Sequence, residues 1–122
     1  MADPDPQNFI RSSFRSVWAI ELMLHLKQHS ERAWSTVELV DTLRSSELVV
    51  ESGLSSLLAA GLVLQEADGR SRYAPASPEI EILATATELL YAKKPDAVRR
   101  MIVVSGNHGV HAFADAFLLR KD

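Results

Sequence analysis

Residues 34–74 read WSTVELVDTLRSSELVVESGLSSLLAAGLVLQEADGRSRYA, and this stretch decides the fold. It opens with a capping box: the hydroxyl of Ser35 can accept from the amide of Glu38, whose carboxylate can reach back to the amide of Ser35. We therefore predict a helix that begins there and ends near Leu43. A short turn follows, and Ser46 is the expected cap of a second helix.

The second helix is predicted to bury one side and to end at a glycine. Its apolar residues recur at helical spacing, which indicates a buried stripe made of Val50, Leu54, Leu57 and Leu58. Gly61 readily adopts the left-handed conformation that ends a helix, so we expect the helix to reach Ala60. Two short strand-like runs follow on either side of Asp68 and Gly69, a pair typical of a tight hairpin. Pro75 should end the second strand.

Helices are predicted on both sides of this stretch. Apolar residues at spacings of three and four predict one continuous helix over residues 8–29. After the hairpin, Ser77 is the expected cap of a helix over residues 78–94, with proline at its first position. Two further helices are predicted at residues 96–104 and 110–119. The expected fold class is mostly α with a small β-hairpin.

Length and composition indicate one soluble globular domain. The chain has 122 residues, of which 47% are hydrophobic and 24% charged. It has no cysteine, which excludes disulfides and thiolate metal sites. No apolar run reaches the ~18–20 residues that cross a bilayer, and the start MADPDPQNF lacks the basic region of a signal peptide. We expect a cytoplasmic protein without membrane contact, with a flexible arm (1–8), a core (9–76) and a helical extension of the same domain (77–122).

The order of helix, capped helix, turn, helix, glycine and hairpin resembles the winged helix-turn-helix superfamily, which includes bacterial repressors of the MarR and ArsR type. Residues 54–63, LSSLLAAGLV, carry the resemblance, because they are typical of a recognition helix that leads into the wing. The resemblance implies a winged helix-turn-helix core with C-terminal helices added, a short third strand near Trp34, and a bacterial regulator of transcription. The same fold serves DNA binding, protein docking and dimerisation.

The predicted recognition helix carries few groups suited to DNA. In a winged helix this element enters the major groove, so its outward residues should touch bases. Those residues are Glu47, Leu48, Glu51, Ser52 and Ser55. Ser52 and Ser55 are candidate DNA contacts, but phosphates repel the two carboxylates, and arginine, lysine, asparagine and glutamine are missing. The formal net charge of −3 also gives no basic surplus.

The predicted wing is better suited to phosphates. Arg70 and Arg72 flank Ser71 and are expected on one face of a strand beside the hairpin tip. They are candidate DNA contacts; the alternative is that they are solvated charges that protect a strand edge. The sequence therefore leaves two functions open. One is a transcriptional regulator that binds DNA through its wing, and the other is a non-catalytic adaptor that binds a protein partner or dimerises.

The last predicted helix supplies a candidate interface. Val110, Phe113, Phe117 and Leu118 fall on one face of residues 110–119. An amphipathic helix of this kind must bury its phenylalanines on its own domain, on a second subunit or on another protein, and the sequence does not separate these outcomes. A small-molecule pocket between the first helix and the extension also stays open.

No residues of the chain form a recognisable catalytic or metal site. His25 and His29 lie four residues apart and His108 and His111 three apart, but no cysteine or acidic cluster completes either pair as a zinc site. All four are expected to be surface histidines. No spacing indicates a nucleophile beside a base. We expect no enzyme activity, no metal and no cofactor.

Overall fold

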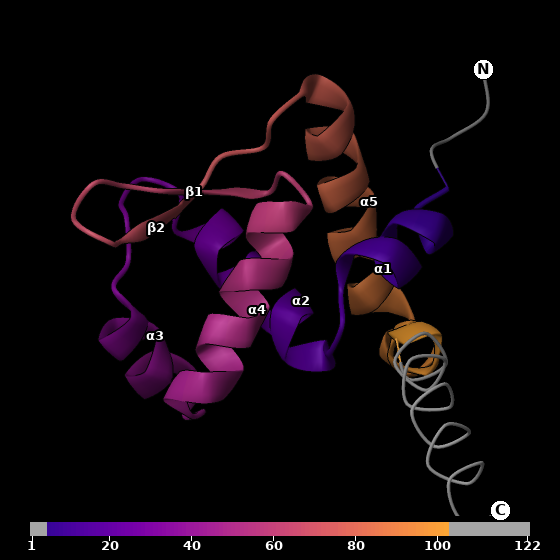
Figure 1. The fold of residues 1–122 in the computed structure, drawn as a ribbon. Helices are drawn as coiled ribbons and strands as arrows, with labels where there is room; N and C mark the ends of the chain where they lie inside the picture. The colour runs from indigo at the N-terminus through magenta and orange to yellow at the C-terminus, as the bar shows by residue number, and fades with distance from the viewer. Residues whose placement is uncertain (1–4, 103–122) are drawn as a thin grey trace, which may run out of the picture.

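Serine side chains determine where several helices begin in the computed structural model, which describes residues 5–102. Ser16, Ser35, Ser46 and Ser77 each accept a hydrogen bond from the amide three residues further on. The helices are α1 (Gln7–Ser13), α2 (Val17–Gln28), α3 (Thr36–Leu43), α4 (Glu47–Ala59) and α5 (Pro78–Lys93), and residues 95–102 are also helical. Together with one two-stranded hairpin, they confirm the mostly α fold class (Figure 1).

The predicted single helix over residues 8–29 is wrong, because the chain breaks between α1 and α2. Phe14 is extended, with φ −115° and ψ 115°, and Ser16 starts a new helix by accepting from the amide of Ala19 at 3.3 Å. The break buries the ring of Phe14 almost completely. It also exposes the carbonyl of Ser13 to the hydroxyl of Ser56 on α4, which donates to it at 2.6 Å. The break therefore interrupts the helix and lets the residues around it contact α4.

The hairpin consists of β1 (Val63–Gln65) and β2 (Ser71–Tyr73), which pair antiparallel with Leu64 opposite Arg72. Its tip has Gly69 at φ +90°, a conformation that glycine adopts without strain. Trp34 adds the expected third strand as a single bridge: its amide donates to the carbonyl of Ser71 at 2.7 Å, and the amide of Ser71 donates back at 2.8 Å. Arg70 precedes β2, so it lies in the turn and not on the strand as predicted.

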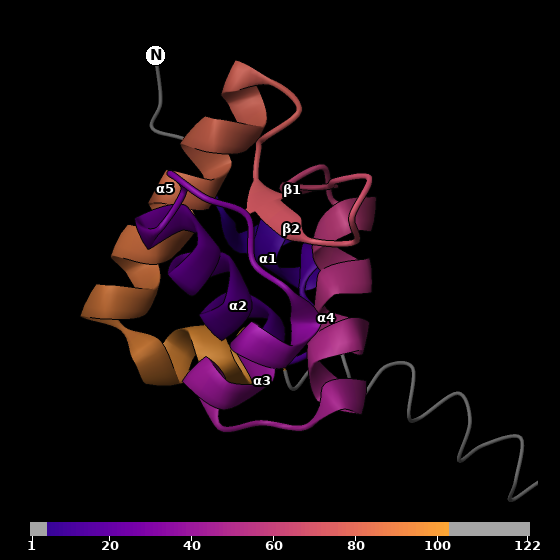
Figure 2. The same cartoon turned by 90° about the vertical axis from the view of Figure 1, so that its left-hand side faces the viewer.

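Helix α2 lies at the centre of the core, with α4 and α5 on either side of it (Figures 1 and 2). Four of its side chains, Ile20, Leu22, Met23 and Leu26, are completely buried. A Cβ added to Gly53 of α4 would come within 2.4 Å of Cδ1 of Leu22, so α4 packs closely against α2. One prediction for α4 is wrong: Leu58, assigned to the buried stripe, is exposed.

Polar contacts attach α5 to α2. Tyr91 donates its hydroxyl proton to Glu21 at 2.8 Å, and the ammonium of Lys27 lies 3.2 Å from the carboxylate of Glu88. Ala84, Tyr91, Val98 and Ile102 belong to the same hydrophobic core as α2 and α4. The described part of the C-terminal extension thus shares one core with the rest of the chain.

Candidate interaction surfaces

The exposed side of α4 is acidic and apolar. Glu47, Leu48, Glu51, Ser52 and Ser55 are all exposed, as the sequence predicts. Leu48 has 76% of its surface exposed, and Val37 on α3 has 71%. On α4 the exposed Leu48 stands between Glu47 and Glu51 in the sequence, and this helix carries no positive side chain that could hold a phosphate.

The two arginines of the hairpin both face carboxylates. The guanidinium Nε of Arg70 lies 3.7 Å from Asp68, and that of Arg72 lies 3.6 Å from Glu66. All four side chains are well exposed, so each pair contributes only about 0–1 kcal/mol and can exchange partners. The hairpin nevertheless presents equal numbers of positive and negative groups, which weakens its attraction for phosphate. Sequence reasoning missed the pairing, although Glu66 and Asp68 stand close to the arginines in the chain.

His25 and His29 both pack against Trp34; His29 is exposed, as expected of a surface histidine, whereas His25 is half-buried and the surface position expected for it is wrong. The ring centroids of His25 and Trp34 are 4.4 Å apart, and those of the two histidines are 4.7 Å apart. The Nε2 atom of His25 is buried without a hydrogen-bond partner. Burial, with smaller contributions from His29 and Arg32, lowers the pKa of His25 below its usual 6.5. Among residues 5–102, no group of three or more histidine, aspartate or glutamate side chains is arranged to hold a metal ion.

Arg32 extends this aromatic cluster to the start of α3. Its guanidinium lies 3.9 Å from the centre of the Trp34 ring, and one of its nitrogens lies 2.5 Å from the carboxylate of Glu38. Glu38 also accepts from the amide of Ser35, which completes the predicted capping box. The hydrogen bond from Arg32, followed by that from Ser35, lowers the pKa of Glu38 to about 2. This arrangement fixes the connection between α2 and α3 and is structural in character.

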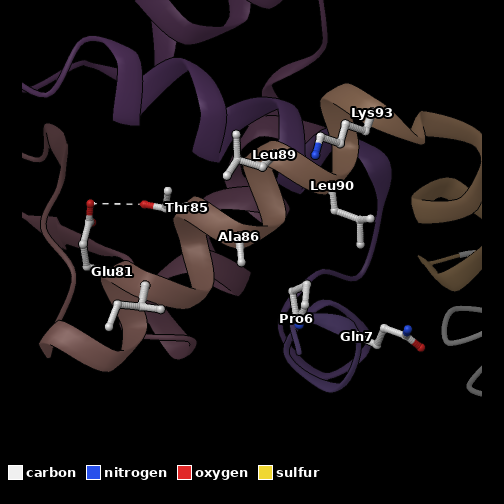
Figure 3. A pocket seen from close by; sticks show the side chains of 9 residues that line it. Pro6, Gln7, Glu81, Thr85, Ala86, Leu89, Leu90 and Lys93 are labelled. Carbon is white, nitrogen blue, oxygen red and sulfur yellow. Dashed lines mark hydrogen bonds between the residues drawn. The ribbon is translucent and has the colours of Figure 1, made fainter. Parts of the chain in front are cut away.

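A groove of about 690 Å³ runs between α1 and α5 (Figure 3). Ala86 and Leu90 lie on the side of α5 that faces Pro6 (Figure 3). The remaining lining residues are Gln7, Glu81, Ile82, Thr85, Leu89 and Lys93. The groove is mostly apolar, with a carboxylate at one end and an ammonium at the other. It lies between the first helical segment and the extension, where the sequence left a pocket open.

A second, smaller cleft of about 480 Å³ lies where α2, α3 and α5 meet residues 95–102. Its lining combines the exposed ring of Trp18 with Glu21, Tyr91 and Arg99. Glu21 already accepts from the hydroxyl of Tyr91, and the guanidinium of Arg99 lies 3.2 Å from Asp96. Its polar groups are therefore largely engaged with one another.

The predicted tail interface of Val110, Phe113, Phe117 and Leu118 lies outside the described residues, as do His108 and His111. Within residues 5–102, no helix is long and apolar enough to cross a membrane. No protein-family model matches the chain, and no curated protein or solved structure matches it. The surfaces above must therefore be interpreted from their own chemistry.

Proposed function

We propose that the chain is a winged helix-turn-helix module that acts as a non-catalytic adaptor and docks a protein partner on the exposed side of α4. The observation that carries this proposal is the chemistry of that side: Glu47 and Glu51 with the largely exposed Leu48 between them. In the expected fold this is the position of a DNA-reading helix. Two carboxylates there oppose the counterion release that drives DNA binding.

The same chemistry indicates the class of partner. An exposed leucine supplies an apolar contact, and the flanking carboxylates attract lysine and arginine side chains. A basic amphipathic helix offers both kinds of group at helical spacing.

A synthetic peptide with leucines on one helical face and lysines on the other is the direct probe of this surface. We expect Glu47→Gln with Glu51→Gln to weaken binding at low salt by up to about thirtyfold, since each of the two exposed ion pairs contributes about 0.2–1 kcal/mol. Leu48→Ala should weaken it by a similar factor through lost apolar contact. The measurement is a fluorescence titration with a labelled peptide.

The matched control is Glu79→Gln, which removes an equally exposed carboxylate from the first turn of α5. It should weaken peptide binding only by the small amount expected from removing one negative charge from the protein. If Glu79→Gln weakens binding per charge as much as the α4 substitutions do, the peptide is responding to overall charge and the proposed docking surface is wrong.

A DNA-binding regulator is the second candidate, and the exposed hairpin arginines favour it. Arg70 and Arg72 stand at the tip and on the exposed face of β2, where exchange of their carboxylate partners for phosphate is cheap. A titration against random duplex DNA at low salt tests it, with Arg70→Ala and Arg72→Ala as the paired variant. Absence of binding at micromolar protein eliminates this candidate, and binding that the paired variant abolishes would favour it over the adaptor.

A further inference from the structure

The side of α5 that faces α1 carries apolar groups without a partner among the described residues. Ile82 is 51% exposed and Leu89 is 58% exposed, and both line the groove. With Ala86 and Lys93 they follow a spacing of four, three and four residues, which places them along one helical face. An apolar strip of this kind on a small domain marks a docking site.

We propose that residues 110–119 of the same chain dock in this groove as an amphipathic helix. Their apolar residues, Val110, Phe113, Phe117 and Leu118, follow the spacing of such a helix. The lengths match: at 1.5 Å per residue, residues 110–119 span about 15 Å, and the groove side of α5 from Glu81 to Lys93 spans about 18 Å. This inference does not depend on the surface of α4.

The charges at the two ends of the groove set the direction. The chain leaves α5 at Lys93, and after residues 95–102 it has seven residues, 103–109, which reach at most about 24 Å. This reach exceeds the length of the groove, so the charges select the direction. A parallel helix would bring Arg120 and Lys121 to the ammonium of Lys93, which repels them, so the segment starts at the Lys93 end and runs antiparallel to α5. Arg120 and Lys121 then arrive near Glu81, whose carboxylate marks the opposite end of the groove.

The short connection also decides between the chain's own segment and that of a second copy. A connection of only a few residues gives the two segments that it joins an effective concentration in the millimolar range. A second copy at micromolar concentration cannot compete with this. We therefore assign the groove to the same chain.

Paired cysteines in the full-length chain test the inference, because the sequence contains no cysteine of its own. In the antiparallel arrangement Leu89 lies four residues from Lys93 and Phe113 three residues from Val110, so the two face each other. Leu89→Cys with Phe113→Cys should form a disulfide within one chain, read as a fast-migrating monomer on a non-reducing gel. Ala86→Cys with Phe117→Cys tests the same direction one turn further along.

The control pairs Leu64→Cys with Phe113→Cys, since Leu64 is an exposed leucine on the hairpin, on the α4 side of α2 (Figures 1 and 2). We expect both groove pairs to close at least about tenfold faster than this control. Equal rates for the groove and hairpin pairs would overturn the proposal. A covalent dimer as the main product would overturn it in favour of a second copy.

Discussion

Helices α4 and α5 flank the same central helix, but they are held in different ways. Helix α4 packs so closely that a methyl group at Gly53 would collide with Leu22, and its exposed side combines two carboxylates and two serines with Leu48. Helix α5 is attached to α2 through polar contacts of Tyr91 and Glu88, and its groove side leaves two large apolar residues uncovered. Both helices contribute side chains to the core, but the exposed side of α4 combines a leucine with carboxylates, whereas the exposed side of α5 borders an apolar groove.

The largest expected effect is a difference in the free energy of unfolding between one leucine variant on α4 and one on α5. Leu57 of α4 is fully buried, so Leu57→Ala should lower the free energy of unfolding by about 2–5 kcal/mol. Because the groove beside Leu89 is proposed to hold residues 110–119, Leu89→Ala on α5 should lower it by a smaller amount, about 1 kcal/mol, in the full chain. A change of less than about 0.5 kcal/mol at Leu89 would indicate that the groove is empty, which would contradict the docking of residues 110–119. Urea unfolding of both variants makes the measurement.

This contrast was only partly visible in the sequence. The caps, Gly61 and the Asp-Gly tip predict the elements from Ser35 to Tyr73, because these signals act locally through backbone hydrogen bonds. The break at Phe14 was missed because its cause is non-local: the ring is buried in the core, and the Ser13 carbonyl bonds to Ser56, 43 residues away. Apolar periodicity continues through the break and conceals it.

For the candidate surfaces, too, local sequence patterns predict less where the feature depends on contacts between distant parts of the chain. Periodicity correctly predicted the exposed residues at the start of α4, from Glu47 to Ser55, but it placed the exposed Leu58 on the buried side. The groove between α1 and α5 depends on how two helices far apart in the chain are placed, and no local pattern encodes that. The burial of His25 against Trp34 was missed for the same reason.

A second comparison concerns one hydrogen bond on each helix. Ser56 of α4 is buried, and Ser56→Ala leaves the carbonyl of Ser13 without its partner, which should cost about 1–3 kcal/mol. Tyr91→Phe on α5 removes a bond to the half-buried Glu21, which water can replace, so we expect about 0.5–1.5 kcal/mol. Ser55→Ala, at the exposed neighbour, is the control in thermal unfolding. If Tyr91→Phe destabilises the protein more than Ser56→Ala does, the proposed difference between α4 and α5 is wrong.

The smallest effects concern pH, and the two sides of the molecule should respond at opposite ends of the scale. On the α3 side, the pKa of Glu38 is lowered to about 2 from 4.5. The unfolded chain then binds more protons than the folded chain in that interval, so stability is lost as the pH falls from about 4.5 towards 2. The lowered pKa of His25 has the same sign, and its contribution is lost as the pH falls below 6.5.

On the α5 side the sign reverses. Burial, together with the hydrogen bond to Glu81 of α5, raises the pKa of Tyr73 above its usual 10. The folded chain keeps a proton that the unfolded chain releases, so stability is present below pH 10 and is lost as the pH rises above it. Urea midpoints measured from pH 3 to pH 11 should therefore decline at both ends. Glu38→Gln should reduce the slope of the acid limb alone, where His25 also contributes. Tyr73→Phe should reduce the slope of the alkaline limb alone, where Tyr91 also contributes because burial and its hydrogen bond to Glu21 raise its pKa. If either substitution flattens both limbs, the two sides are coupled through α2, and the division drawn between them does not hold.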